Sequence, residues 1–127
     1  MKNMKNVACV VLINDQGQVL CVSRKDDHNN WGLPGGKSEP EDLTELDTAY
    51  RETLEETGLE VFGLRLVFAT HKDGYMSYTY LAKYMGEINH NEPHVVKWGT
   101  WDDLIAGSFG KYNQLVYESL VDMGVIK

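Results

Sequence analysis

Three glutamates and an arginine lie close together near the end of a predicted helix. They are Arg51, Glu52, Glu55 and Glu56, and the partial negative charge at a helix C-terminus opposes carboxylates there. Glu52 and Glu56 are also four residues apart, a like-charge spacing that costs a helix about 0.2–0.5 kcal/mol. Because a divalent cation with oxygen ligands would remove this repulsion, the residue types indicate a site for Mg²⁺ or Mn²⁺.

A glycine turn, Gly35-Gly36, precedes the helix that carries these acids. Glycine lets backbone approach a site closely and can offer a carbonyl oxygen as a ligand. Arg51 could hold a carboxylate in a forked, two-bond pair. Together these groups predict metal-assisted attack of water on a phosphoanhydride, with a nearby glutamate taking the proton. A solvated helix face beside a structural turn is the alternative interpretation.

The acid-bearing helix is predicted to run from Asp42 or Leu43 to Thr57, because Gly58 follows directly and glycine commonly ends helices. Apolar residues at three- and four-residue spacing predict its buried stripe, with the three glutamates on the opposite side. That stripe consists of Leu43, Leu46, Ala49, Tyr50, Thr53, Leu54 and Thr57.

Runs of β-branched and aromatic residues predict the strands around this helix. We expect strands at 7–13, 19–23, 59–70, 75–85 and 95–101, with the first two forming a hairpin. Asp73-Gly74 predicts a hairpin between the two long strands. Asp102 is expected to cap a short helical turn, and a closing helix at 111–123 is expected to bury Leu115, Val116 and Leu120. Strands with helices packed on them indicate an α/β fold with a mixed sheet.

The bulk composition limits the class of protein. A chain of 127 residues that is 43% hydrophobic and 24% charged predicts one globular domain, residues 1–127. A net charge of −7 argues against a nucleic acid polymer as partner, although a bound cation could still admit a nucleotide. The chain shows no apolar run of membrane length and no apolar signal core at its start, so we expect no membrane association and a cytoplasmic location.

The segment 31–59 resembles the signature of the Nudix hydrolases, G-x5-E-x7-R-E-U-x-E-E-x-G-U, in which U is aliphatic. Gly36 matches its first position, and residues 51–59 match its second half. The spacing from Gly36 to Arg51 is one residue longer than the pattern, so either Glu41 or Asp42 could stand for the intermediate glutamate. This resemblance implies a Nudix-like α/β/α sandwich with a mixed central sheet.

The resemblance also implies the roles of individual residues. The implied metal ligands are the carboxylates of Glu52, Glu55 and Glu56 and the backbone carbonyl of Gly36, with Mg²⁺ or Mn²⁺ as the ion. The implied catalytic residues are Arg51, Glu52 and Glu55, and the identity of the general base stays open. A further acid from a later loop could be Glu87 or Glu92. The predicted substrate-binding residues are Arg24, Lys37, Tyr75 and Tyr78.

The expected activity is hydrolysis of a nucleoside diphosphate linked to another group. A nucleoside or deoxynucleoside triphosphate, cleaved to a monophosphate and pyrophosphate, is the preferred substrate. Dinucleoside polyphosphates are one alternative, and a non-catalytic, nucleotide-binding Nudix-like regulator is another. The expected partner is thus a small-molecule nucleotide, and a homodimer is left open.

Overall fold

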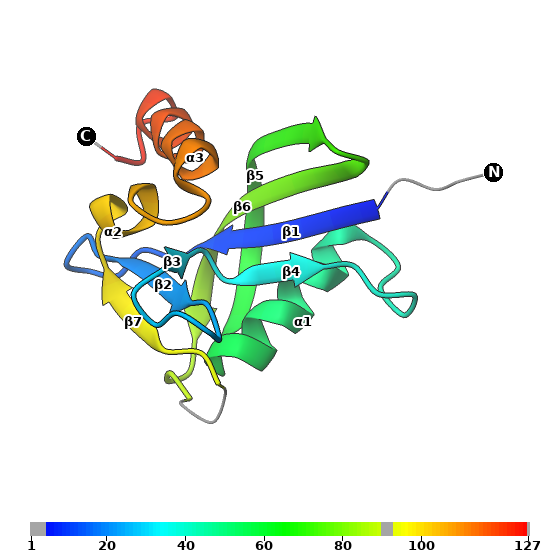
Figure 1. Ribbon diagram of the computed structural model, residues 1–127, viewed down its shortest axis with the longest axis horizontal. Coiled ribbons are helices and arrows are strands. Elements are labelled where there is room, and N and C mark those ends of the chain that lie inside the picture. The colour runs from blue at the N-terminus through cyan, green and yellow to red at the C-terminus, as the bar shows by residue number, and fades with distance from the viewer. Residues whose placement is uncertain (1–4, 90–92, 127) are drawn as a thin grey trace.

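The computed structural model describes residues 5–89 and 93–126. Figure 1 labels its elements along the chain. The strands are β1 (Lys5–Val11), β2 (Val19–Ser23), β3 (Trp31–Gly32), β4 (Gly35–Lys37), β5 (Glu60–Lys72), β6 (Tyr75–Met85) and β7 (Val96–Gly99). The helices are α1 (Glu45–Thr57), α2 (Trp101–Ile105) and α3 (Gly110–Asp122). None of the helices in these residues has the length and apolar character that crossing a bilayer requires.

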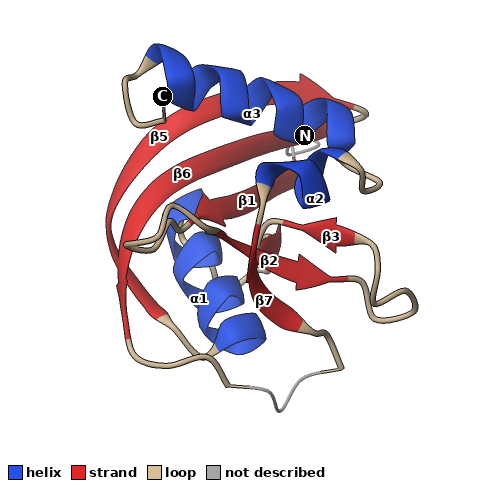
Figure 2. Cartoon of the chain, turned by 90° about the vertical axis from the view of Figure 1, so that its left-hand side faces the viewer, coloured by secondary structure: helices blue, strands red, loops and turns tan. Residues whose placement is uncertain are grey.

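The strands form two sheets, one of which is mixed. The four-stranded sheet has the order β4-β1-β6-β5. Strand β1 is parallel to β6, whereas the β4–β1 and β6–β5 pairs are antiparallel. The smaller sheet has the antiparallel order β3-β2-β7. Helices α1 and α3 lie on opposite sides of the four-stranded sheet (Figure 2). The expected α/β fold with helices on both faces of a mixed sheet is therefore confirmed.

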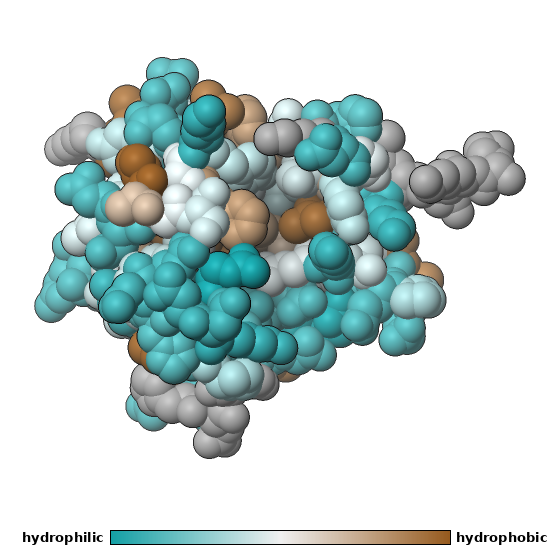
Figure 3. All heavy atoms as spheres, viewed as in Figure 1, coloured by the Kyte–Doolittle hydropathy of each residue, from teal (hydrophilic) through white to brown (hydrophobic). Residues whose placement is uncertain are grey.

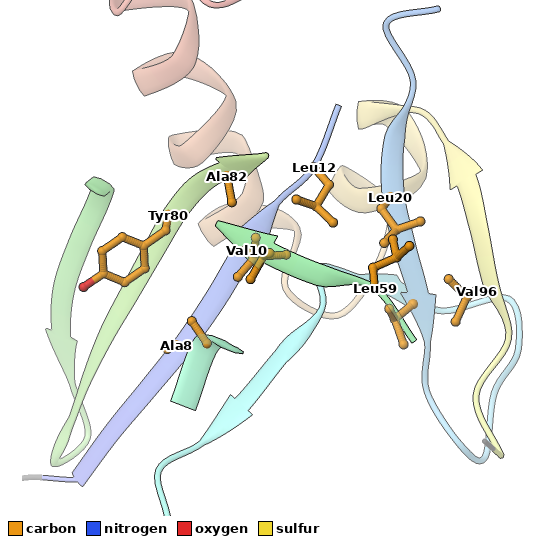
Figure 4. Packing of buried hydrophobic residues seen from close by; sticks show 11 residues of the cluster. Ala8, Val10, Leu12, Leu20, Leu59, Tyr80, Ala82 and Val96 are labelled. Carbon is orange, nitrogen blue, oxygen red and sulfur yellow. The ribbon is translucent and has the colours of Figure 1, made fainter. Parts of the chain in front are cut away.

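Strand β1 supplies both faces of the core, because successive side chains of a strand point in opposite directions. Ala8 and Val10 pack in the cluster that includes Ala49 of α1, as part of the core in Figure 4. Val11 packs in a second cluster with Val116 and Leu120 of α3.

Both predicted hairpins form, and they differ in length. Asp73 and Gly74 have φ values of 55° and 81°, the positive angles that a two-residue hairpin turn needs, and β5 and β6 pair as expected. The predicted hairpin of the first two strand segments is present but short: Ile13 and Val19 form an antiparallel bridge, and the N–H groups of Asn14 and Leu20 donate to the carbonyls of Gln18 and Leu12, each at 3.0 Å. Beyond this point the two strands enter different sheets, because β1 pairs with β4 and β6.

Helix α1 begins at Glu45, later than predicted. Asp47 accepts hydrogen bonds from the backbone N–H groups of Leu43 (2.9 Å) and Thr44 (3.3 Å), which stabilises the N-terminus. Gly58 ends the helix in a left-handed conformation (φ 79°), as expected.

The buried stripe of α1 differs from the prediction. Ala49, Thr53 and Thr57 are buried as predicted, and Thr48 is buried in addition. Small residues of this kind allow the helix to pack closely on β1 and β4. Four residues of the predicted stripe are exposed instead: Leu43 (90%), Leu46 (36%), Tyr50 (42%) and Leu54 (47%). Their assignment to the core was wrong, because hydropathy selected the larger residues and the close contact with the sheet selects the smaller ones.

The C-terminal elements correct two further assignments. Thr100, and not Asp102, caps α2: its hydroxyl accepts a hydrogen bond from the backbone N–H of Asp103 at 3.2 Å. On α3, Val116 and Leu120 are buried as predicted, but Leu115 is exposed. The remaining buried position of this helix is taken by Asn113, whose side chain donates to the Leu104 carbonyl at 3.1 Å.

Candidate active site

A cavity of about 1230 Å³ lies beside the glycine turn. Its walls come from β1, the 24–30 loop, β3 and β4, the β5–β6 hairpin and the segment 105–113. On the face seen in Figure 3, neutral and hydrophobic residues are recessed among hydrophilic ones. Gly35, Gly36 and Glu56 all line this cavity, so the glycine turn and one of the helix acids face the same space.

The glycine turn lies directly against two of the three acids of α1. The backbone N–H of Gly35 donates a hydrogen bond to Glu56 Oε1 at 2.9 Å. A Cβ atom on Gly36 would overlap the carboxylate of Glu52. Gly35 has φ of 153°, and a Cβ there would lie only 2.7 Å from Cys9 Cα. A side chain at Gly36 would therefore push the turn away from α1, and a side chain at Gly35 would push it away from β1. The predicted close approach of backbone to the acids depends on these glycines.

Arg51 holds a carboxylate in the forked geometry that the sequence suggested, and its partner is Asp42. Its Nε and Nη2 atoms donate to Asp42 Oδ1 (3.1 Å) and Oδ2 (2.8 Å). The side chain of Asp42 is 5% exposed, and the hydrogen bonds from Arg51 hold its pKa well below its usual range. Of the two candidates for the intermediate acid, Asp42 therefore contacts Arg51, whereas Glu41 is exposed.

The same guanidinium reaches the acids of α1. Nη1 of Arg51 lies 3.2 Å from Glu55 Oε1 and 3.4 Å from Glu52 Oε2. Its Nη2 also donates to the carbonyl of Lys37 at 3.2 Å. Arg51 thus connects β4, the residues before α1 and two of the helix acids, while it does not line the cavity itself.

The three glutamates are divided between two environments. Glu52 and Glu56 lie against the glycine turn, and Glu55, with its side chain 56% exposed, accepts from Arg51. Within residues 5–89 and 93–126, no three His, Cys, Asp or Glu side chains are grouped so as to hold a metal ion. Mg²⁺ commonly uses one or two carboxylates and completes its shell with water and substrate phosphates. Glu52 and Glu56 fit that donor set, and ligation by Glu55 stays a prediction.

The register of β4 bears on the proposed carbonyl ligand. Gly36 lies opposite Ala8, between inter-strand hydrogen bonds at Val10–Pro34 and Ser38–Asn6. In an antiparallel ladder this alternation directs the polar groups of Gly36 toward β1. A carbonyl oxygen has two lone pairs, so a role for Gly36 as a ligand depends on the second one and stays a prediction.

Burial changes the acidity of the groups beside the turn. Desolvation raises the pKa of Glu52 above its usual value, and the nearby Arg51 acts in the opposite direction. Burial also raises the pKa of Cys9 to about 12, with repulsion from Glu56 and Glu52 adding to the effect. Both shifts reflect a region beside the glycine turn in which negative charge is poorly solvated.

Three of the four predicted substrate-binding residues line the cavity. Arg24 and Lys37 face it, and Tyr75 lies beside Lys37 with the ammonium nitrogen 5.3 Å from the ring centroid. Tyr78 does not line the cavity; it stacks on Tyr80 and packs against the core cluster of α1. Positions 75 and 78 of one strand face opposite sides of the sheet. The prediction that both tyrosines bind the substrate is therefore wrong for Tyr78.

Of the two candidates for a later acid, Glu87 is the one within the described residues. Glu87 is exposed and does not line the cavity, and its carbonyl lies near Gly58 at the end of α1. Glu92 lies outside the described residues. A further acidic ligand from this loop stays a prediction.

The sequence matches the family model of the NUDIX domain over residues 2–118. The chain belongs to the Nudix hydrolase family. The signature of this family covers Gly36 of the turn and the Arg51–Glu56 cluster. Of the two candidates for its intermediate glutamate, Asp42 is the one that pairs with Arg51, and its assignment to that position stays a prediction.

Relatives and solved structures agree with this assignment. An RNA pyrophosphohydrolase from Psychrobacter sp. (strain PRwf-1) is 39% identical over 82 residues, which are 64% of this chain and 44% of that protein. A Bacillus subtilis (strain 168) protein named "Putative 8-oxo-dGTP diphosphatase" is 47% identical over 51 residues, which are 40% of this chain and 33% of that protein. The matched regions thus span less than half of each relative.

The fold is also shared with a solved structure of the Nudix family. The crystal structure of MutT NUDIX hydrolase from Burkholderia pseudomallei has a TM-score of 0.74 and 26% identity to this chain. The match covers 94% of this chain and 99% of that chain. The expected Nudix-like architecture is therefore confirmed.

Several residues that line the cavity were not predicted from the sequence. Asn30, Phe109, Tyr112 and Asn113 all line the cavity. Nothing in their spacing relates them to the Nudix signature. The glycines on both sides of Ser108-Phe109 were the available signal, because an aromatic residue between glycines is typical of a loop that presents a side chain.

Proposed function

We propose that this Nudix protein hydrolyses a nucleoside or deoxynucleoside triphosphate to a monophosphate and pyrophosphate, with Mg²⁺ or Mn²⁺ as cofactor. The observation that carries the proposal is the contact of Glu52 and Glu56 with the glycine turn at the wall of a large cavity. Arg24 and Lys37 line that cavity and supply positive charge for an anionic substrate. The names of the Psychrobacter and Bacillus relatives, which both specify pyrophosphate bonds, support this substrate class.

Each residue of the site has a distinct proposed task. A divalent cation bound there would neutralise phosphate charge and lower the pKa of an attacking water. Glu52 and Glu56 would hold it at the glycine turn, and Arg51 would orient Glu52 and Glu55 through its fixed guanidinium. Glu52 and Glu55 are the candidates for the proton acceptor, since both lie at this end of α1 and neither is tied to Gly35.

A second candidate substrate is the 5′-triphosphate end of an RNA. The Psychrobacter relative is named an RNA pyrophosphohydrolase and shares 39% identity with this chain. Such an end carries the same triphosphate group, so it would place the same bonds at the glycine turn. The net charge of −7 disfavours broad contact with the rest of the polymer, which makes free nucleotides the preferred class.

The test is a substrate panel assayed for release of pyrophosphate and phosphate, with Mg²⁺, with Mn²⁺ and with EDTA. The panel contains nucleoside and deoxynucleoside triphosphates, 8-oxo-dGTP, a dinucleoside polyphosphate and a 5′-triphosphorylated RNA. We expect metal-dependent release of pyrophosphate from free triphosphates. Turnover confined to the RNA would favour the second candidate, and metal-independent turnover would contradict the proposed chemistry.

A charge-neutral variant tests the site directly. Glu56→Gln should lower turnover by at least about 10²-fold, because loss of one metal-ligating carboxylate removes several kcal/mol of transition-state stabilisation. Glu60→Gln is the matched control, since Glu60 is an exposed glutamate that does not line the cavity. Near wild-type turnover by Glu56→Gln at saturating Mg²⁺ would remove Glu56 from the proposed ligands.

A further inference from the structure

Thr48 is a fully buried residue of α1 whose hydroxyl forms hydrogen bonds with groups outside the helix. Its Oγ1 atom donates to Asp42 Oδ2 at 2.9 Å and lies 2.6 Å from Ser38 Oγ. A threonine within a helix commonly donates to the carbonyl four residues earlier, as Thr57 does to Thr53. The contacts of Thr48 instead join α1 to the segments that precede it, so apolar packing alone does not account for its burial.

The direction of each hydrogen bond follows from the groups involved. Asp42 is paired with Arg51 as a carboxylate, and a carboxylate can only accept. The single hydroxyl proton of Thr48 therefore goes to Asp42, and in the contact between the two hydroxyls Ser38 is the donor. The chain of donors thus runs from Ser38 through Thr48 to the carboxylate that holds the arginine.

The first member of this chain is held by the sheet. Ser38 directly follows β4, and its backbone N–H donates to the Asn6 carbonyl of β1 at 2.8 Å. The carbonyl of the preceding residue, Lys37, accepts from Arg51 Nη2 at 3.2 Å. The hydroxyl of Ser38 is thus attached to the paired part of the sheet, and through Thr48 it locates a carboxylate that belongs to a loop.

The carboxylate of Asp42 is held from several directions, although this residue precedes α1. Its Oδ2 atom accepts from Glu39 N–H at 2.9 Å, from Thr48 at 2.9 Å and from Arg51 Nη2 at 2.8 Å. The bond from Glu39 closes a local turn, in which Asp42 N–H donates to the Glu39 carbonyl at 2.9 Å. Of these donors, Thr48 is the one that ties the carboxylate to α1 without belonging to the ion pair.

Thr48 also lies on the side of α1 that carries the acids. At about 100° per residue, Thr48, Glu52 and Glu55 fall within roughly 60° of one another. The arginine that binds Asp42 directs its third nitrogen at Glu52 (3.4 Å) and Glu55 (3.2 Å). A change in the orientation of the Asp42 carboxylate would therefore be transmitted through Arg51 to the glutamates.

We propose that Thr48 is a positioning residue of the active site. Its hydroxyl, oriented by Ser38, holds the carboxylate of Asp42 in the orientation that directs the guanidinium at the glutamates. Loss of a partner that orients metal ligands commonly lowers metal affinity or activity by about 10–100-fold. Thr48 is one contact further from the glutamates than Arg51, so its effect should lie at the lower end of that range. The inference rests on the proposed function only where turnover is measured.

Hydrogen exchange at Arg51 tests the positioning without a substrate. The Nε–H group of Arg51 donates to Asp42 Oδ1, and its NMR signal is assigned by its absence in Arg51→Lys. Thr48→Val should speed the exchange of this proton by about 10-fold or more, because a less constrained hydrogen bond opens more often. Thr48→Ser keeps the hydroxyl and should restore the slow exchange of wild type.

Thr53→Val is the matched control, because Thr53 is equally buried on α1 and its hydroxyl has no hydrogen-bond partner among the described residues. It should leave the exchange of the Arg51 proton within about 2-fold of wild type. Unchanged exchange in Thr48→Val would overturn the proposal. Equally fast exchange in Thr48→Ser would overturn it too, since the effect would then come from packing of the methyl group.

A double-mutant cycle tests whether Ser38 acts through Thr48. Ser38→Ala alone should speed the exchange of the Arg51 proton, by less than Thr48→Val does. In the Thr48→Val background the same change should have little further effect, because the chain of donors is already broken. Independent, additive effects of the two changes would overturn the role assigned to Ser38.

Steady-state kinetics on the best substrate of the panel connects the positioning to the reaction. Thr48→Val should lower kcat by about 10-fold and change KM by less than about 3-fold. Thr48→Ser should restore kcat, and Thr53→Val should not lower it. A raised KM with an unchanged kcat, or no effect on either constant, would overturn the role of Thr48 in the reaction. Absence of turnover by wild type would overturn only the proposed function, because the exchange measurement does not depend on it.

Discussion

The guanidinium of Arg51 binds both carboxylate oxygens of Asp42, at 3.1 Å from Nε and 2.8 Å from Nη2. Its remaining nitrogen, Nη1, is directed at Glu52, which lies beside the glycine turn, and at the exposed Glu55. Asp42 thus holds the guanidinium of Arg51 in one orientation, and the guanidinium in turn orients the carboxylates of Glu52 and Glu55. Since Arg51 does not line the cavity, this chain of contacts assigns it to positioning.

Arg51→Lys should lower kcat by about 10–100-fold, the usual effect of losing a group that orients metal ligands. KM should change by less than about 3-fold, because an ammonium keeps the charge but cannot reproduce the planar fork. Steady-state kinetics on the best substrate of the panel measures both constants. A raised KM with an unchanged kcat would show instead that Arg51 binds the substrate.

The Asp42–Arg51 pair should make stability depend on acid pH. Arg51 depresses the pKa of folded Asp42, so the stabilisation is fully present above the unfolded pKa of about 3.9 and is lost as pH falls below it. Urea unfolding of wild type and Asp42→Asn at several pH values measures the effect. The difference in unfolding free energy should be constant from about pH 5 to 7 and shrink toward pH 3. A difference that does not vary with pH would contradict the assignment.

Thr53→Val should stabilise the protein by about 1 kcal/mol or more. The Thr53 hydroxyl is buried and has no hydrogen-bond partner among the described residues, and leaving such a group unpaired costs about 1–3 kcal/mol. Thr57→Val is the matched control on the same face of α1. Its hydroxyl donates to the Thr53 carbonyl at 2.6 Å and accepts from Leu59 N–H at 3.1 Å, so its loss should destabilise. Equal effects of the two variants in chemical unfolding would refute this account.

Two leucines only a few residues apart should respond very differently to truncation. Leu54→Ala should change the free energy of unfolding by less than about 1 kcal/mol, because Leu54 is 47% exposed. Leu59→Ala should cost about 2–5 kcal/mol, because Leu59 is 1% exposed in the core. Urea denaturation of both variants measures the contrast. A large loss for Leu54→Ala would mean that an assembly buries this side of α1.

Cys9 should resist alkylation even though it lines the cavity. Its pKa of about 12, against 9.0 for a free thiol, lowers the reactive thiolate fraction at pH 8 by about 10³-fold. A Cys21→Ala variant isolates Cys9, and its iodoacetamide labelling rate is compared with that of the urea-unfolded protein in EDTA. Native labelling at the unfolded rate would show that the thiol is not held in its neutral form.

The sequence was informative wherever chemistry or a turn fixes residue types locally. The charges from Arg51 to Glu56, the glycines at 35 and 36 and the Asp73-Gly74 turn could be predicted because each requirement lies within a few residues. The forked pair of Arg51 could also be predicted, although choosing Asp42 over Glu41 required the geometry.

The rest could not be predicted, because it depends on segments that meet only in the folded chain. The apolar spacing of α1 predicted Ala49 to be buried, but only the packing of the helix on the sheet shows that Thr48 is buried and Leu54 exposed. The contact of Asn30 with Ser108 joins two loops far apart in the sequence. Neither a hydrophobic period nor a motif encodes a contact of that kind.

The position of β1 between β4 and β6 has a consequence for how the protein is made. Val7 lies opposite both Lys37 and Ser77, so β1 cannot complete its pairing until β6 has been synthesised. Closing so long a loop has a large entropic cost and slows folding relative to chains with local contacts. The glycine turn is paired to that same strand. We therefore expect the glutamates and the turn to meet late in folding, after most of the chain has emerged.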